Sequence, residues 1–495
     1  MTRKNETRFT AALCLLMAAL LVLLCSQSSP LYPINLWDDA NCLLTVGRVM
    51  RAGGVLYRDI YEQKGPTLYL LHWIAACISD NSFFGVYVME TLAAAATLLF
   101  ACRLLRLRMS PCASIAGACL PFALLLTSAS FARGDSAEEF CLPFLAAALY
   151  VAFAEYDRSD GPMRAPRLFV CGLLAGAVAT IKYTALGLFI GLCLCEGLLA
   201  LRAGGIKRAA KSALAFLAGM ALPVALWCAY FAANGALGDF FTAYVTNNVF
   251  LYDAGSGAAD ALREVLRIAR DNALWLLPAA LGVGLFALFG REKGALRLCA
   301  ALTAACAAAC ALGLGRLWPY CALTIGAVLP VALLGWRAPV RRAEPRRQEG
   351  RAMGRAASLA CVALSLLLAW VVSPNAFLRG VPLSEIAQGR LAAQMEPGAT
   401  LLQYSHLDDG LYLASGALPR GKYFVRLNVR YGEMIDALDG YVARGEPDYV
   451  LISWRELPEE FARYELIAQD TAYDDANRLN KALYLYRRKA EVGSP

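Results

Sequence analysis

Charged residues are scarce in this sequence. They make up 17% of its 495 residues, whereas 59% are hydrophobic, and the mean hydropathy is +0.49. Soluble domains carry about 25% charged residues. The scarcity therefore excludes an intrinsically disordered chain, a coiled coil and an ordinary soluble enzyme. Long apolar runs between so few charges are typical of a polytopic membrane protein.

Several chemical signatures are also missing. Only His72 and His406 are present, and no two cysteines have CxxC spacing, which argues against a zinc site. Nearly all of the 17 cysteines lie inside apolar runs, where they act as small hydrophobic side chains. Neither a Walker A sequence nor a GxGxxG motif after a strand occurs. The sequence therefore requires no cofactor and no cytosolic nucleotide.

The net charge of +8 does not indicate nucleic acid as a partner, because of where the charges lie. Residues 374–495 hold 14 basic and 17 acidic groups, which leaves 33 basic and 22 acidic groups in residues 1–373. The positive excess thus lies between the apolar runs. This distribution is expected of cytoplasmic loops.

Eleven apolar runs are long enough to cross about 30 Å of hydrocarbon. They fall at residues 10–26, 83–102, 112–130, 139–155, 168–181, 184–201, 212–233, 272–290, 295–314, 318–336 and 356–373. The first could be a cleaved signal peptide, but no A-x-A site follows it, so we expect an uncleaved span. Residues 67–79 are apolar but too short to span, and they predict an interfacial or re-entrant helix.

Lysines and arginines orient the chain. They cluster before the first run and after every second one: Arg3, Lys4 and Arg8; Arg103, Arg106 and Arg108; Arg158, Arg164 and Arg167; Arg202, Lys207, Arg208 and Lys211; Arg291, Lys293 and Arg297; and seven arginines in 337–355. With the N-terminus inside, eleven spans place every cluster in the cytoplasm. We therefore expect a multi-pass plasma-membrane protein whose residues 374–495 lie outside.

The tail after the last run has the pattern of a small α/β domain. Residues 399–404, 448–453 and 482–488 read as strands, and residues 432–445 read as an amphipathic helix. The predicted organisation is a membrane domain, residues 1–373, with a first external loop at 27–82, followed by an extracytoplasmic α/β domain at 374–495. No chemical motif stands out in the tail.

The first external loop is unusually polar. Asp38 and Asp39 begin a stretch with helical spacing that ends at Gly53 and Gly54. A helix N-terminus favours ionised carboxylates, so the pair could be catalytic. A simple helix cap would explain the same two residues.

A second group in this loop precedes Gly65 and Pro66. It contains Arg58, Asp59, Glu62 and Lys64. Two cations at the lipid–water boundary suit an anionic lipid headgroup, because arginine grips phosphate oxygens and lysine supplies a point charge. Snorkelling of basic side chains to the interface is the competing explanation.

Other predicted external turns also carry ionisable groups. These are Arg133, Asp135, Glu138 and Glu139 before one span, Lys182 between two spans, and Arg316 with Tyr320 in a later turn. A lone lysine between apolar runs is a candidate functional residue. Snorkelling explains it equally well.

Taken together, these motifs resemble a known family. The order W-D-D, G-R-x-M-x-x-G and Y-R-D-I-Y-E-x-K-G-P in the first loop resembles bacterial GT-C glycosyltransferases, the relatives of protein O-mannosyltransferases and of the lipid A aminoarabinose transferase. The resemblance implies a GT-C fold with about eleven transmembrane helices. It also implies a polyprenyl-phosphate sugar donor and inversion at the anomeric carbon.

The resemblance also implies roles for individual residues. Asp38 would be the general base with Asp39 in support, and Arg58, Lys64 and Lys182 would bind the donor phosphate. A second acid would fall among Asp135, Glu138 and Glu139. A divalent metal is compatible with these acids but not demanded by them. Many relatives have a His-Tyr pair in the late external turn, where this chain has Pro319 and Tyr320.

Two alternatives belong to other classes. A transporter or lipid-linked sugar flippase would have charges in a central cavity and often inverted repeats. A non-catalytic envelope-assembly protein would explain the tail but not the acids and cations of the first loop. The acceptor stays open among envelope glycans, lipids and proteins.

Overall fold

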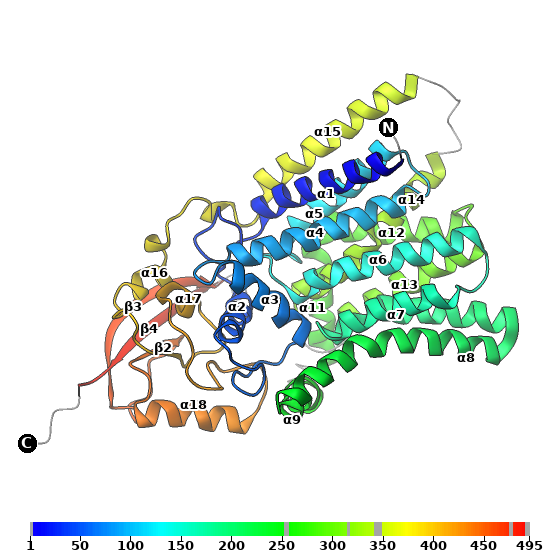
Figure 1. Cartoon of the computed structure of the whole chain (residues 1–495). Coiled ribbons are helices and arrows are strands. Elements are labelled where there is room, and N and C mark those ends of the chain that lie inside the picture. Colours follow the sequence, from blue (N-terminus) through cyan, green and yellow to red (C-terminus); the bar gives the residue numbers. More distant parts are fainter. Residues whose placement is uncertain (1–2, 252–256, 314–316, 341–348, 475–478, 491–495) are drawn as a thin grey trace, which may run out of the picture. The chain divides into compact units, whose positions relative to one another are not determined.

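The computed structural model of the chain describes residues 3–251, 257–313, 317–340, 349–474 and 479–490 (Figure 1). The chain forms two compact units, each assembled from three segments. Unit 1 comprises residues 1–26, 89–228 and 254–377, and unit 2 comprises residues 27–88, 229–253 and 378–495. The predicted first external loop and the predicted C-terminal domain thus fold in the same unit.

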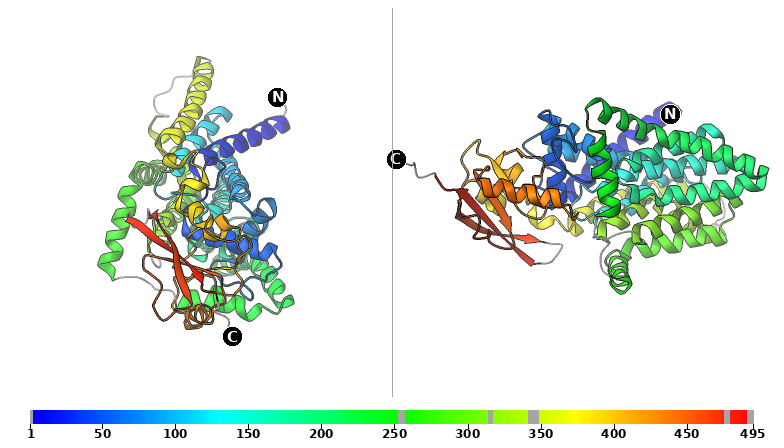
Figure 2. Two further views of the ribbon diagram at one scale, coloured as in Figure 1. Left: turned by 90° about the vertical axis from the view of Figure 1, so that its left-hand side faces the viewer. Right: turned by 90° about the horizontal axis from the view of Figure 1, so that it is seen from below.

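Unit 1 is a bundle of apolar helices. It contains α1 (Arg3–Cys25), α4 (Phe84–Leu105, from Met89 on), α5 (Pro111–Leu126), α6 (Ala137–Arg158), α7 (Ala165–Ala179), η1 (Tyr183–Leu186), α8 (Gly187–Ala233, as far as Cys228), α11 (Ala258–Asp271), α12 (Ala273–Phe289), α13 (Gly294–Gly313), η3 (Pro319–Val328), α14 (Leu329–Val340) and α15 (Glu349–Val372). Helices α1, α5 and α15 contact one another, α12 contacts α13 and α14, and α6 contacts α7 and η3. The right-hand view of Figure 2 shows long helices of the bundle running side by side.

The expected multi-pass membrane architecture is confirmed. Each of the eleven predicted apolar runs falls on a helical segment. Among the described residues, six helices are long and apolar enough to cross a membrane, or seven if α11 and α12, which meet at 94°, count as one span. Helices α5 and α7 and residues 356–372 of α15 are apolar but shorter. The count of about eleven spans stays a prediction.

Two of the predicted spans belong to one bent helix. Helix α8 turns sharply at Gly204 and Gly205, where Gly205 has a φ of +64°. Glycine adopts this left-handed conformation without steric cost. The limb before the bend approaches α13 at Gly191, and the limb after it approaches α7 at Gly172. The predicted short loop between residues 201 and 212 is therefore this bend.

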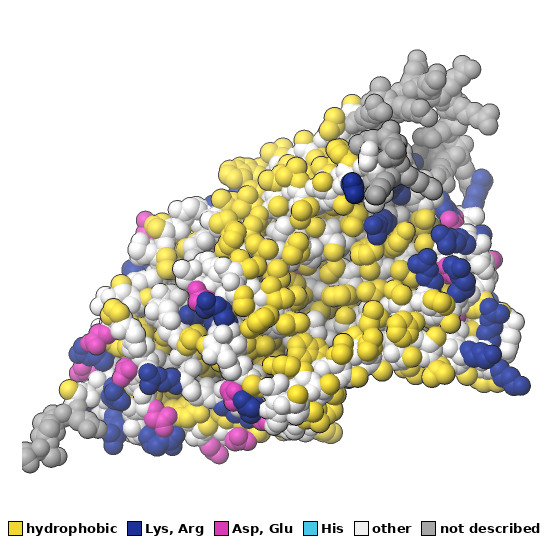
Figure 3. Space-filling model, in the orientation of Figure 1, with side chains coloured by type: hydrophobic (Ala, Val, Ile, Leu, Met, Phe, Trp, Pro, Cys, Tyr) yellow, Lys and Arg dark blue, Asp and Glu magenta, His cyan; other side chains and the backbone are white. Residues whose placement is uncertain are grey.

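Three predicted cytoplasmic loops meet at one end of unit 1. The guanidinium of Arg108 donates to Asp157 at 2.5 Å and to Glu292 at 2.7 Å. The ammonium of Lys293 donates to the carbonyl of Asp157. Figure 3 shows lysine and arginine side chains gathered at the end of the bundle where α6 ends, beside the mainly apolar surface of the helices. This grouping agrees with one common side for these loops.

Unit 2 combines short helices with a four-stranded sheet. Its elements are α2 (Asp38–Arg51), α3 (Pro66–Ile78), α9 (Leu237–Phe240), the π-helix η2 (Phe241–Thr246), α10 (Asn247–Phe250), η5 (Leu383–Glu385), α16 (Ala387–Ala392), β1 (Leu401–Gln403), α17 (Leu411–Ser415), α18 (Gly432–Arg444), β2 (Tyr449–Ser453), β3 (Tyr464–Asp474) and β4 (Leu479–Arg488). The strand order is β1-β2-β4-β3, with β1 and β2 parallel and the other pairs antiparallel.

The three strands and the helix predicted in the tail are confirmed as β1, β2, β4 and α18. The predicted helix at 67–79 is confirmed as α3, and its place at the membrane interface stays a prediction. Strand β3 was not predicted, because Glu465, Gln469 and Asp470 interrupt its apolar residues. It lies at the edge of the sheet, where polar side chains are tolerated.

Helix α2 is held between α3 and the segment that follows β1. At Gly47 it passes so close to α3 that an added Cβ would lie 2.5 Å from the carbonyl oxygen of His72. The buried guanidinium of Arg48 donates to the carbonyl of Tyr412 within α17 and to those of Gly416 and Ala417 just after it. Gly47 and Arg48 of the loop motif therefore fix α2 in unit 2.

Candidate functional site

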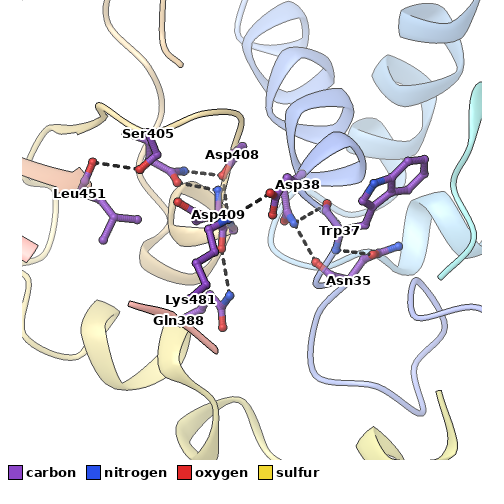
Figure 4. Close-up of polar contacts among 12 residues, drawn as sticks. Asn35, Trp37, Asp38, Gln388, Ser405, Asp408, Asp409, Leu451 and Lys481 are labelled. Atoms are coloured by element: carbon purple, nitrogen blue, oxygen red, sulfur yellow. Dashed lines mark hydrogen bonds and ion pairs between the residues drawn. The ribbon is translucent and has the colours of Figure 1, made fainter. Parts of the chain in front are cut away.

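The loop before α2 fixes the position of the acidic pair. The side-chain oxygen of Asn35 accepts from the backbone N–H of Trp37 at 2.9 Å. The side-chain amide of Asn41 donates back to the carbonyls of Asn35 and Trp37. Asp38, labelled in Figure 4, and Asp39 are the first two residues of α2, as the helical spacing of this stretch predicted. The positive end of the helix dipole stabilises both carboxylates.

Asp39 forms an ion pair with Lys64, which the sequence analysis had placed in a separate group of the same loop. The ammonium donates to Asp39 Oδ1 at 2.7 Å and to Glu62 Oε1 at 3.0 Å. Glu62 also accepts from the backbone N–H of Lys64. Burial alone lowers the pKa of Lys64, but the two carboxylates outweigh it and raise this pKa well above its ordinary value. Lys64 is therefore charged at neutral pH.

Asp38 has a lysine partner that sequence reasoning missed. Lys481, on β4, donates to Asp38 Oδ2 at 3.1 Å and also forms an ion pair with Asp409 (Figure 4). Burial lowers the pKa of Lys481, and the carboxylates of Asp409 and Asp38 raise it above its ordinary value. The available signals were a second Asp-Asp pair, at 408 and 409, and a lysine at the start of an apolar strand.

Asp408, which precedes Asp409 in the chain, accepts hydrogen bonds from neutral groups. Its carboxylate accepts from the hydroxyl of Thr45 at 2.7 Å, from the backbone N–H of Gly410 at 2.8 Å and from the amide of Gln403. Burial raises the pKa of Asp408 to about 6. The contact with Thr45 ties this segment to α2.

Arg58 has other partners than Lys64 does. Its guanidinium donates to Asp59 at 2.9 Å and to the carbonyl of Asn234 at 2.7 Å. The side chains of Arg58 and Asp59 are about 40% exposed. The hydrogen bonds to Arg58 lower the pKa of Asp59. This pair lies on the surface of unit 2, whereas Asp39, Glu62 and Lys64 are largely buried.

Unit 1 brings together three of its predicted external turns. The ammonium of Lys182 donates to Glu138 at 2.6 Å and lies 5.0 Å from the centre of the Tyr320 ring. The carbonyl of Arg133 accepts from the hydroxyl of Ser26 at 3.4 Å. Arg316 lies outside the described residues. Lys182 and Tyr320 therefore form one group with Glu138.

The other two acids of this region lie with a carboxylate that the sequence did not single out. The backbone N–H of Asp135 donates to Glu90 at 2.8 Å and to Glu139 at 3.0 Å. The hydroxyl of Ser26 donates to both oxygens of Glu90. The sequence pattern did not indicate Glu90 as a site residue, because it is an isolated acid within an apolar span. In the part of the chain that the structure describes, no cluster of three His, Cys, Asp or Glu residues is arranged to hold a metal ion.

No family model and no curated protein sequence matches the chain. Its structure is similar to two crystal structures of ArnT from Cupriavidus metallidurans. For the one bound to undecaprenyl phosphate the TM-score is 0.61, with 13% identity over 100% of both chains. For the apo state the TM-score is 0.62, with 13% identity over 98% of both chains.

The chain has the ArnT-like GT-C fold. The GT-C fold was expected from the motifs of the first external loop, and the likeness extends over the whole chain. Within the GT-C fold of this chain, α2 carries the acidic pair and the segment before α3 carries its lysine. At 13% identity the likeness establishes the fold, and the roles of individual residues remain predictions.

Proposed function

We propose that the chain is an integral membrane glycosyltransferase that moves a sugar from a polyprenyl-phosphate donor to an acceptor outside the cytoplasm. The observation that carries this proposal is the acidic pair at the start of α2, with a lysine on each carboxylate. It is supported by the ArnT-like fold, since one ArnT structure is bound to undecaprenyl phosphate. The plasma membrane, with the N-terminus inside, is the proposed location.

Asp38 is the proposed general base. Its side chain is 29% exposed, whereas that of Asp39 is 12% exposed and is engaged by Lys64. The carboxylate of Asp38 takes the proton of the acceptor hydroxyl while the acceptor oxygen attacks the anomeric carbon. The bond from that carbon to the phosphate oxygen breaks, and polyprenyl phosphate leaves. Asp39 supports Asp38 by holding Lys64 beside it.

The negative charge that develops on the departing phosphate has to be stabilised by cations. Lys64 is the proposed partner in unit 2, and a phosphate oxygen would replace Asp39 as an acceptor of its ammonium. Lys182, which now donates to Glu138 within unit 1, keeps the donor-phosphate role that the resemblance implies. Arg58 and the second acid, among Asp135, Glu138 and Glu139, keep the roles that the resemblance implies.

Replacing the base tests the proposal. Asp38→Asn, reconstituted with a panel of undecaprenyl-phosphate monosaccharides and an envelope extract as acceptor, should form product about 100-fold or more slowly than the unaltered chain. The amide keeps the shape of the side chain but cannot take the proton. Asp80→Asn is the matched control, because Asp80 is an exposed carboxylate of the same loop paired with Arg51.

Each result is informative. Unchanged transfer by Asp38→Asn removes Asp38 as the base. Movement of the lipid-linked sugar across the membrane without a glycosylated product would favour a flippase, and neither activity would favour an assembly protein. Mass spectrometry of envelope glycans from a deletion strain would identify the sugar and the acceptor together, since one polymer should lack one residue.

A further inference from the structure

The strongest unassigned feature of unit 2 is the lysine that β4 directs at α2. The side chain of Lys481 is 6% exposed, and its ammonium joins Asp38 and Asp409 (Figure 4). Burying an ammonium is costly unless carboxylates compensate it, so two acids around one buried lysine form a tightly defined arrangement.

The backbone of Asp409 is held by two glutamine side chains. Its backbone N–H donates to Gln403 Oε1 at 2.7 Å, and its carbonyl accepts from Gln388 Nε2 at 3.0 Å. Its side chain is 2% exposed. Asp409 therefore anchors the inner side of Lys481, and the accessible member of the triad is Asp38.

The arrangement suits a carboxylate that changes its charge. With Asp38 ionised, Lys481 stands between two negative groups. When Asp38 takes a proton, Lys481 keeps Asp409 as its counter-ion, so no buried charge is left uncompensated. If Lys481 served only to join β4 to the rest of unit 2, Asp409 would be a sufficient partner and the contact with Asp38 would not be needed.

We propose that Lys481 is a positioning residue for the general base, so that the C-terminal sheet completes the catalytic site. The inference rests on the proposed function. Lys481 holds the Asp38 carboxylate in one orientation through its hydrogen bond to Oδ2, and it places a positive charge next to that carboxylate. The acceptor hydroxyl then meets a base that is charged and already oriented.

The test compares Lys481→Met with the unaltered chain in the transfer assay with undecaprenyl-phosphate monosaccharides. We expect kcat to fall about ten-fold and the acid limb of the kcat/KM profile to move up by about one pH unit. The KM for the donor should stay unchanged. Lys481→Arg should restore most of the activity, since it keeps the charge. Lys422→Met, which breaks the Lys422–Asp239 ion pair of the same unit, is the matched control and should leave the acid limb in place.

A second variant distinguishes the positioning role from a folding defect in Lys481→Met. Asp409→Asn leaves Asp38 as the only carboxylate paired with Lys481, so its acid limb should move down rather than up. The two opposite shifts together support the proposal.

The outcomes that overturn it are distinct. If the unaltered chain transfers sugar, Asp38→Asn does not, and neither variant moves the acid limb, the positioning role is wrong while the proposed function stands. An equal loss of activity in Lys422→Met likewise assigns Lys481 a structural role only. If the unaltered chain transfers no sugar from any donor of the panel, the proposed function fails and this inference fails with it.

Discussion

Asp408 shows what burial does to a single carboxylate of unit 2. Its three partners, Thr45, Gly410 and Gln403, are neutral groups, so desolvation prevails and raises its pKa from 3.8 to about 6. The folded chain therefore binds a proton on Asp408 more tightly than the unfolded chain does. The resulting stabilisation is fully present below pH 4 and is lost as the pH rises through 6.

The direction of this pKa shift predicts how the free energy of unfolding depends on pH. From pH 4 to pH 7 the chain should lose about 2 kcal/mol of unfolding free energy relative to Asp408→Asn, which cannot titrate. Thermal unfolding of both proteins in detergent across this range measures the difference. Asp80→Asn, at an exposed carboxylate, should run parallel to the unaltered chain. Parallel curves for Asp408→Asn as well would contradict the prediction.

At the scale of elements, α2 depends on a close contact with α3. A Cβ on Gly47 would lie 2.5 Å from the backbone carbonyl oxygen of His72, and a backbone atom cannot rotate away. We expect Gly47→Ala to destabilise unit 2 by about 1–3 kcal/mol, because the helices must separate. Because α2 begins with Asp38 and Lys64 precedes α3, sugar transfer should fall too.

Thermal unfolding and the transfer assay check this expectation. Gly432→Ala is the control, since Gly432 is the first residue of α18 and a Cβ there meets nothing within 4 Å. A Gly47→Ala protein as stable and active as Gly432→Ala would show that α2 and α3 can separate freely.

Local sequence patterns predicted α2, α3 and the residues between them, but they could not predict contacts between residues far apart in the chain. The acidic pair, the glycines after α2 and the Lys64 group all lie within one loop, so spacing was enough to relate them. Lys481 stands 443 residues after Asp38, and no periodicity connects the two. Strand β3 was missed for a related reason, since an edge strand needs no apolar face of its own.

At the scale of the whole molecule, the orientation of unit 1 in the membrane can be tested with its own cysteines. Cys112 is exposed at the start of α5, close to Arg108, whose partners belong to two other predicted cytoplasmic loops. A membrane-impermeant maleimide should label Cys112 in inside-out vesicles and not in intact cells. Cys112→Ser identifies the labelled position by loss of that signal. Cys77 is also exposed and lies in the predicted external loop, so only labelling of intact cells that is lost in Cys112→Ser would reverse the proposed orientation.

The composition of unit 2 has a consequence for biogenesis. Its three segments are residues 27–88, 229–253 and 378–495, so the unit stays incomplete until the last of them has been synthesised. At about 5–20 residues per second, Asp38 leaves the ribosome roughly 20 to 90 s before Lys481. Through that interval the nascent chain holds the carboxylate without its lysine, and a transcript that stops early yields a membrane-inserted protein with no completed site.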